Sequence, residues 1–224
     1  MSEYWRPRRA GNAPIYERKE NHMPKIILAS ASPRRKELLQ QINADFIAIP
    51  SEIDEDSLIT AEMPPGGAAR TLAEAKARAV SGDKRIGGYK NDCIIIGADT
   101  IVWAKGRMLG KPADAAEAFD MLSLLQDDWH TVYTGVCVIR VKDGEIIKTS
   151  GFTDGADVFI RSLEAREIDA YIKTGEPFDK AGAYAAQGFG ALIVERVRGD
   201  FFTVVGLPVV RLNTVLAEYG AAFL

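Results

Sequence analysis

Two adjacent arginines stand where the sequence predicts the start of a helix. Ser32 is typical of an N-cap and Pro33 of a first helical residue, and apolar residues follow at helical spacing. Arg34 and Arg35 therefore fall in the first turn, where the helix dipole is already positive. Each is placed unfavourably there by roughly 0.3–1 kcal/mol, and a bound anion would reverse the penalty.

Two interpretations of this arginine pair stay open. The hydroxyls of Ser30 and Ser32, the first backbone N–H groups of the helix and both guanidinium groups could converge on one phosphate. Alternatively, Arg34 and Arg35 both extend into water. The first interpretation predicts a phosphate site formed by a strand, a turn and a helix.

A carboxylate interrupts the most apolar run of the chain. Residues 93–103 are rich in β-branched side chains and predict a central strand that is covered on both faces. Burying Asp99 in that strand is costly unless its carboxylate is paired, binds a metal or faces a cleft. Asp99 is therefore either the partner of a neighbouring lysine or a general base or metal ligand.

Further charged side chains could reach the same place. In a helix predicted over 68–80, the 3.6-residue period puts Lys76 in the middle of the apolar arc. Lys76 either extends along that face to the surface or binds a phosphate. Lys111 follows the Asp99 strand closely. The acidic run 52–56 fits a solvated loop, and it could also supply a carboxylate to a divalent cation.

The rest of the chain divides into short strands and helices. Residues 142–144 predict the turn of a hairpin, and the glycine-rich stretch 176–188 predicts a loop of the kind that commonly carries function. The predicted strands cover 26–28, 46–49, 93–103, 131–139, 145–149, 156–160, 191–194 and 201–205. The predicted helices cover 33–42, 68–80, 114–126, 162–173 and 208–219.

Composition excludes several classes of protein. The 224 residues, 47% of them hydrophobic and 26% charged, suit one globular domain or two small lobes. A net charge of -3 argues against nucleic-acid binding driven by overall charge. Cys93 and Cys137 lie in apolar runs and are expected to be free thiols. With His22 and His130 as the only histidines, a histidine-rich metal site is excluded.

The N-terminal segment differs from the rest. Residues 1–23 mix arginines, prolines and glycine without an apolar period, and we predict a disordered tail. Met23 could be an alternative start. No apolar run is long enough for a membrane span and no signal-peptide pattern is present. We therefore expect a cytoplasmic protein with no membrane partner and no stable nucleic-acid partner.

Six motifs together resemble the Maf family. Each is weak alone, but they occur in the family's order and at its spacing over residues 25–219. A Maf-like domain is accordingly expected over 24–222. The motifs are Ser-Ala-Ser-Pro-Arg-Arg at 30–35, Gly-Ala-Asp-Thr at 97–100, Gly-Lys-Pro at 110–112, His-Thr-Val-Tyr-Thr-Gly at 130–135, Asp-Lys-Ala-Gly-Ala-Tyr with Gln-Gly at 179–188, and Val-Gly-Leu-Pro at 205–208.

The resemblance implies a nucleoside triphosphate pyrophosphatase, which hydrolyses the α–β phosphoanhydride to a nucleoside monophosphate and pyrophosphate. It also implies an elongated α/β fold similar to inosine triphosphate pyrophosphatases, with a mixed sheet and two lobes that flank a cleft. Members of the family depend on a divalent cation, here expected to be Mg²⁺ or Mn²⁺. They are often dimeric, so a homodimer is expected.

The resemblance also assigns roles to residues. Asp99 matches the family's proton acceptor. From this match and the acidic run at 52–56, we expect Asp99 and Glu55 to hold the metal. Arg34, Thr100 and Gln187 match the residues of a pyrimidine-directed class that acts on dTTP and UTP, as opposed to a class that acts on 7-methyl-GTP. An ordinary and a modified pyrimidine triphosphate both stay open as substrates. The expected substrate-binding residues are Ser30, Ser32, Arg34, Arg35, Lys76, Thr100, Lys111, Lys180 and Gln187.

Two other functions compete with this one. A hydrolase with a serine nucleophile would need a histidine base, and His22 falls in the predicted tail, which leaves His130 alone for a triad. A non-catalytic nucleotide-binding regulator of septum formation would have no need for a carboxylate such as Asp99 buried beside a phosphate site.

Overall fold

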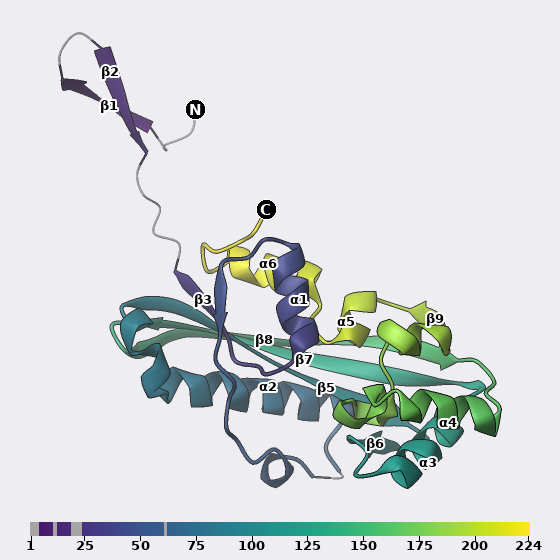
Figure 1. Cartoon of the computed structure of the whole chain (residues 1–224). Helices are drawn as coiled ribbons and strands as arrows, with labels where there is room; N and C mark the ends of the chain where they lie inside the picture. The colour runs from purple at the N-terminus through teal and green to yellow at the C-terminus, as the bar shows by residue number, and fades with distance from the viewer. Residues whose placement is uncertain (1–4, 11–12, 19–23, 61) are drawn as a thin grey trace.

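A seven-stranded mixed sheet forms the centre of the molecule (Figure 1). The computed structural model of the chain describes residues 5–10, 13–18, 24–60 and 62–224. The strand order is β4-β3-β5-β7-β8-β9, and β6 pairs with β5. The strands are β3 (Lys25–Leu28), β4 (Phe46–Ala48), β5 (Asp92–Ala104), β6 (Arg107–Leu109), β7 (Asp128–Lys142), β8 (Glu145–Ile160) and β9 (Val194–Arg198).

One edge of β5 is left open in its middle. β3 pairs in parallel with residues 93–96 of this edge, and β6 pairs antiparallel with residues 102–104. Among the described residues no strand covers 97–101 on that side, whereas β7 pairs with β5 along the other edge. Because side chains alternate along a strand, Asp99 and Thr100 at this gap extend to opposite faces of the sheet.

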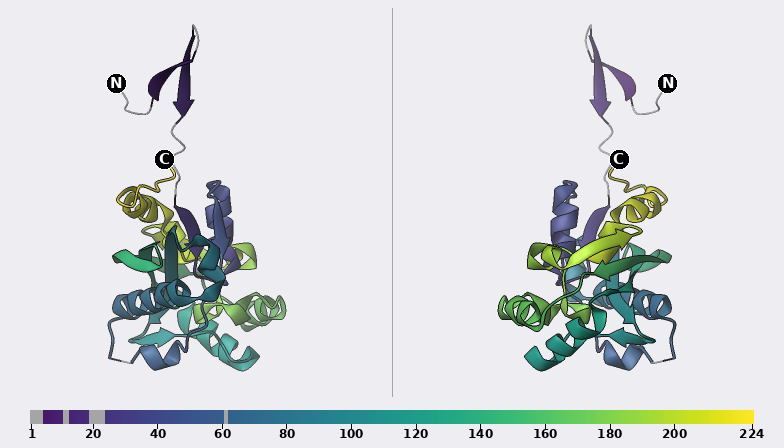
Figure 2. Two further views of the ribbon diagram at one scale, coloured as in Figure 1. Left: turned by 90° about the vertical axis from the view of Figure 1, so that its left-hand side faces the viewer. Right: turned by 90° about the vertical axis from the view of Figure 1, so that its right-hand side faces the viewer.

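Helices cover both faces of the sheet. α2 lies against β5 and β7 on one face, and α1 and α6 pack on the other (Figures 1 and 2). The helices are α1 (Pro33–Gln41), α2 (Pro65–Gly82), α3 (Ala115–Leu125), α4 (Ala165–Lys173), α5 (Phe201–Val205) and α6 (Val209–Ala217). Short 3-10 turns lie at η1 (Asp56–Leu58), η2 (Lys84–Tyr89), η3 (Glu176–Asp179), η4 (Ala181–Ala183) and η5 (Gly188–Leu192).

Two hydrophobic cores on the same face of the sheet define two lobes. The first joins Ile96 and Val138 to the apolar sides of α1 and α6. The second joins Val102 and Val158 to α3 and α4, farther along the same strands. A third core lies between the opposite face and α2. The elongated, two-lobed α/β fold with a mixed sheet is therefore confirmed.

Two glycines let α2 approach the sheet closely. A Cβ atom at Gly97 would lie 2.1 Å from the carbonyl oxygen of Ala73, and one at Gly135 would lie 2.4 Å from the carbonyl carbon of Ala69. Either contact is far shorter than real Cβ contacts allow, so glycine is required at both positions. The close approach places Lys76, one turn farther along α2, over the middle of β5.

The structure corrects one predicted strand. Residues 201–205 form the helix α5, although their β-branched side chains favour a strand. The side chain of Asp200 accepts a hydrogen bond from the N–H of Phe202 at 3.0 Å, and Gly206 ends the helix with a φ of 114°. Strong caps at both ends therefore outweigh the local strand propensity.

Two other boundaries also differ from prediction. The strand predicted over 191–194 begins only at Val194, because η5 occupies the preceding residues. The helix predicted from Ser162 begins at Ala165, since the N–H of Glu164 bonds the Glu167 carboxylate at 2.9 Å in a capping arrangement. The strand predicted over 156–160 is the last part of β8, and the remaining helices form close to their predicted positions.

Part of the predicted tail has regular structure. β1 (Trp5–Ala10) and β2 (Ala13–Arg18) pair as an antiparallel hairpin, which departs from the disorder predicted for residues 1–23. The other residues of this segment, including Met23, lie outside the described residues.

Two further expectations can be compared with the structure. Cys93 and Cys137 are buried free thiols, as predicted. Within the described ranges, no helix has the length and apolar character needed to cross a membrane.

Candidate active site

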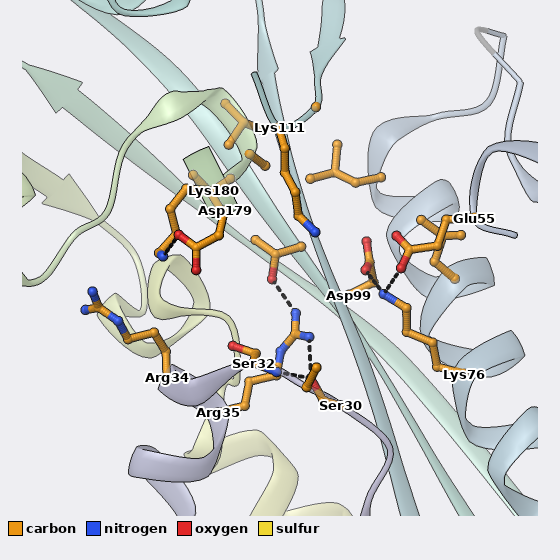
Figure 3. Close-up of a pocket in the computed structure, with 18 of the residues that line it drawn as sticks. Ser30, Ser32, Arg34, Arg35, Glu55, Lys76, Asp99, Lys111, Asp179 and Lys180 are labelled. Carbon is orange, nitrogen blue, oxygen red and sulfur yellow. Dashed lines mark hydrogen bonds and ion pairs between the residues drawn. The ribbon is translucent and has the colours of Figure 1, made fainter. Parts of the chain in front are cut away.

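A cavity of about 1000 Å³ opens at the uncovered edge of β5, between the two lobes (Figure 3). Side chains from both faces of the sheet reach it, because the gap between β3 and β6 lets the cavity wrap around the strand. It is lined by every residue for which the sequence predicts a site role: Ser30, Ser32, Arg34, Arg35, Glu55, Lys76, Asp99, Thr100, Lys111, Lys180 and Gln187.

Asp99 lies in the wall of this cavity beside two other charged groups. It is 8% exposed, and its Oδ1 lies 2.5 Å from Nζ of Lys76. The same Nζ lies 2.9 Å from Oε1 of Glu55, so one ammonium group joins both carboxylates (Figure 3). The ion pair with a neighbouring lysine is therefore present, and all three of its members border the cavity.

Burial controls the protonation of Asp99. It raises the pKa of the carboxyl above its usual value, and the charges of Lys76 and Arg35 oppose part of that rise. Oδ1 accepts the hydrogen bond from Lys76, while Oδ2 accepts none from the side chains that the structure describes. A carboxylate with a raised pKa and an available oxygen is suited to accept a proton from water.

Arg35 is a buried cation that bonds neutral oxygens. It is 8% exposed, and its Nε donates to the carbonyl of Gly206 at 2.8 Å. Nη1 donates to Ser30 Oγ at 3.1 Å and Nη2 to Thr100 Oγ1 at 3.0 Å. Burial lowers the pKa of Arg35, and nearby Asp99 is the larger of two charges that oppose the shift. Within the described part of the chain, no carboxylate contacts this guanidinium, which leaves its charge for an anion in the cavity.

Hydroxyl groups fix the orientation of Thr100. Thr134 donates its hydroxyl proton to the carbonyl of Thr203 at 2.7 Å, and Thr134 Oγ1 lies 2.9 Å from Thr100 Oγ1. Because Thr134 has one hydroxyl proton, Thr100 must be the donor between the two threonines. Thr100 therefore offers a ligand only an acceptor.

Arg34 turns to a different side of the cavity from Arg35 (Figure 3). Its Nη1 donates to Oε1 of Gln187 at 2.9 Å, and its Nη2 donates to Oε1 of Glu176 at 3.2 Å. Two of the three predicted specificity residues are thus in direct contact. Thr100, the third, contacts Arg35 instead.

Further positive charge surrounds the centre of the cavity. Lys111 points into it (Figure 3) and forms no ion pair with the side chains that the structure describes. Lys180 pairs with the adjacent Asp179. The first turn of α1 holds no acidic residue and the Ser32 side chain does not cap it, so its N–H groups are available to an anion.

Sequence reasoning missed three residues of this site. Glu176 bonds Arg34, Thr134 orients Thr100, and Gly206 provides the carbonyl that holds Arg35. Thr134 and Gly206 fall inside the motifs, so their positions could have been flagged. Glu176 begins the stretch 176–188 that the sequence predicts to be a functional loop, but no local pattern distinguishes it from the other residues of that loop.

The split mixed sheet and a cavity that joins a buried carboxylate to the unpaired charges of Arg35 and Lys111 within the described residues define an α/β protein suited to bind an anion. The chain belongs to the family described as Maf-like protein, whose sequence pattern it matches over residues 25–219.

Curated relatives are similar over most of their length. The dTTP/UTP pyrophosphatase of Caldicellulosiruptor saccharolyticus is 48% identical over 198 residues, which cover 88% of this chain and 96% of the relative. The dTTP/UTP pyrophosphatases of Moorella thermoacetica and of Bacillus cereus strain AH187 are each 46% identical at the same coverage. A solved nucleoside-triphosphatase, a dITP/XTP pyrophosphatase from Mycobacterium abscessus, aligns with a TM-score of 0.33 at 16% identity over 67% of this chain and 95% of its own.

Proposed function

We propose that this protein is a nucleoside triphosphate pyrophosphatase that hydrolyses dTTP and UTP to the monophosphate and pyrophosphate. The observation that carries the proposal is the buried Asp99 in the wall of a cavity that five arginine and lysine side chains also line. Relatives named dTTP/UTP pyrophosphatase, at 46–48% identity over most of the chain, support the same reaction and the same bases.

The triphosphate is held by the N-terminus of α1 and by the cations around it. Arg35 and Lys111 supply charges that no carboxylate contacts within the described residues, and Ser30, Ser32 and Lys180 add hydrogen-bond donors. Hydrolysis develops negative charge on the bridging and non-bridging oxygens, so fixed donors at these places stabilise the transition state and the departing pyrophosphate.

Asp99 accepts the proton of the attacking water. Its raised pKa makes it a better base than an exposed aspartate, and the charge of Lys76 opposes part of that rise. The water attacks the α-phosphorus, the bond to the bridging oxygen breaks, and pyrophosphate leaves with the electron pair of that bond.

A divalent cation fits the donors beside Asp99. Two carboxylates, those of Asp99 and Glu55, already share one positive group, the Lys76 ammonium. Mg²⁺ is commonly held by one or two carboxylates together with the phosphates of a substrate. The described residues contain no cluster of three or more His, Cys, Asp or Glu side chains that could hold a metal ion without a substrate. Asp99 and Glu55 would therefore hold Mg²⁺ or Mn²⁺ with the triphosphate. Bound there, the cation would offset charge on the phosphoryl oxygens.

The base is selected at the other end of the cavity. Gln187 and Arg34 are in contact there, whereas Thr100 bonds Arg35. A site that pairs with the polar edge of one base rejects another base by leaving its own groups unpaired. This arrangement supports uracil and thymine as the accepted bases.

The resemblance to the family also supports a homodimer and a catalytic domain over residues 24–222. Size-exclusion chromatography with light scattering tests the homodimer. The activity of a variant that begins at Pro24 tests the catalytic domain. A monomeric mass, or loss of activity in that variant, would contradict the respective proposal.

One assay tests the function. The purified protein is incubated with Mg²⁺ or Mn²⁺ and a panel of nucleoside triphosphates that includes dTTP, UTP, CTP and 7-methyl-GTP, and the products are identified. We expect UMP or dTMP with pyrophosphate, released at least about 100-fold more slowly by the Asp99→Asn variant. Nucleoside diphosphate with phosphate would contradict the pyrophosphatase, absence of turnover would favour a binding protein, and preference for 7-methyl-GTP would overturn only the base class.

A further inference from the structure

Behind the base-selecting side of the cavity, one carboxylate joins three segments of the chain. Glu176 accepts a hydrogen bond from Nη2 of Arg34 at 3.2 Å through Oε1. Through Oε2 it accepts another from the backbone N–H of Gly190 at 3.0 Å. Its side chain is 12% exposed, and it is absent from the lining of the cavity. Glu176 therefore contacts residues that line the cavity but does not line the cavity itself.

The same carboxylate is packed against the turn that follows Gln187. Gly188 has a φ of 65°, and a Cβ atom on it would lie 2.3 Å from Oε1 of Glu176. The turn thus contacts the carboxylate at Gly188 and bonds it at Gly190. Glu176 holds Gln187 in two ways, by this turn on its C-terminal side and by Arg34 at its amide.

The contact with Arg34 fixes which end of the Gln187 amide is free. A guanidinium group only donates hydrogen bonds, so the amide oxygen of Gln187 must face Arg34, as the 2.9 Å contact has it. The NH₂ group is then the end left for a ligand. Because Gln187 lines the cavity, the wall presents a hydrogen-bond donor at this point.

A fixed donor distinguishes pyrimidines that differ in one group. Uracil and thymine carry a carbonyl acceptor at position 4, whereas cytosine carries an amino donor there. We propose that Glu176 is a positioning residue for base selection, which holds Arg34 and the Gln187 amide so that the amide NH₂ donates to a base carbonyl and disfavours cytosine. This inference rests on the proposed pyrimidine triphosphate pyrophosphatase activity.

The first test replaces the carboxylate by an amide of the same shape. In Glu176→Gln one oxygen becomes an NH₂ group, which must face either Arg34 or the N–H of Gly190, and both are donors. We expect the ratio of kcat/KM for UTP over CTP to fall about tenfold, through a higher KM for UTP with kcat nearly unchanged. The matched control is Glu195→Gln, an exposed carboxylate paired with Arg196, which should keep the wild-type ratio.

A second variant reverses the polarity directly. Gln187→Glu keeps an acceptor for Arg34 and replaces the free donor by a second acceptor. We expect the UTP-over-CTP ratio to fall further, by about 100-fold, with CTP gaining relative to UTP. This variant keeps the Glu176 carboxylate and its acceptor for the N–H of Gly190, so it stays informative if Glu176→Gln lowers the melting temperature.

The outcomes separate the two proposals. If the wild type releases no pyrophosphate from UTP or dTTP, the proposed function itself is wrong. If the wild type does so but treats UTP and CTP alike, or if either Glu176→Gln or Gln187→Glu keeps its ratio, the positioning role is wrong and the activity stands. A lower ratio in both variants with a normal ratio in Glu195→Gln supports the positioning role.

Discussion

The two sides of the cavity hold similar charged groups by different means. On one side Asp99 and Lys76 belong to β5 and α2, whose backbones are locked together where Gly97 meets Ala73. On the other side Gln187 lies between short 3-10 turns, and one side-chain hydrogen bond from Arg34 fixes its amide. We call these the reaction side and the base side.

This difference suggests how the protein separates chemistry from selection. The reaction side depends on β5 and α2, which contribute many residues to a hydrophobic core. A shift of either element would therefore also disturb the packing of that core. The base side depends on a few polar contacts of Arg34, Gln187 and Glu176. Substitutions on the reaction side should therefore affect all nucleotides alike, and substitutions on the base side should affect their ratio.

The largest effect is expected at the proposed base of the reaction. Asp99→Asn keeps the shape of the side chain but cannot accept the proton, and we expect kcat to fall by about 10²–10⁴ for every nucleotide. Steady-state release of pyrophosphate measures this. The control is Asp143→Asn, an exposed turn residue with a φ of 51° that asparagine tolerates, which should keep full activity. Normal turnover in Asp99→Asn would contradict the assignment.

The next effect is expected at the buried arginine. Arg35→Lys keeps the charge, but a lysine cannot bond Gly206, Ser30 and Thr100 in the geometry of the guanidinium group. We expect kcat/KM to fall about 100-fold for UTP and CTP alike, and the melting temperature to fall as well. Kinetics and thermal unfolding measure the two effects. A loss confined to one base would place Arg35 on the base side.

A smaller and more selective effect is expected at the neighbouring arginine. In Arg34→Lys one ammonium group replaces two nitrogens that bond Gln187 and Glu176 separately. The ratio of kcat/KM for UTP over CTP should fall about tenfold, while kcat for UTP stays close to that of the wild type. Competition between the two nucleotides in one reaction measures the ratio. An equal loss for both would remove the distinction between the two sides.

The smallest effect is a change in pH dependence. Lys76 lowers the pKa of Asp99, so Lys76→Met should raise that pKa further and leave less of the carboxylate ionised at acidic pH. The acidic limb of kcat/KM should move to higher pH by about one unit or more. Lys142→Met, an exposed lysine at the end of β7, serves as the control. A limb that stays in place would mean that Asp99 is not the group that titrates.

The reaction side was largely predictable because its signals are local. A carboxylate in the apolar run of β5 is costly to bury, and a lysine on the apolar arc of α2 poses the same problem, so each indicates a partner or a ligand. The opposing charges then meet in the structure as the pair of Lys76 and Asp99. Local chemistry could not show that the cavity forms at a gap between β3 and β6.

The base side was less predictable, because its key contact joins distant residues. Arg34 and Glu176 lie 142 positions apart, and Glu176 stands in an irregular stretch without any period. The helix α5 was not predicted for a related reason. The caps at Asp200 and Gly206 stabilise the helix more than the residues between them favour a strand. Contacts made by helix caps and by side chains distant in sequence can be identified only in the folded structure.

The phosphorus that water attacks is the most direct test of the proposed reaction. UTP is hydrolysed in ¹⁸O-enriched water with Mg²⁺, and the products are separated and analysed by mass spectrometry. Attack at the α-phosphorus, with Asp99 as proton acceptor, predicts one ¹⁸O atom in UMP and none in pyrophosphate. Label in pyrophosphate, or in inorganic phosphate released together with UDP, would contradict it.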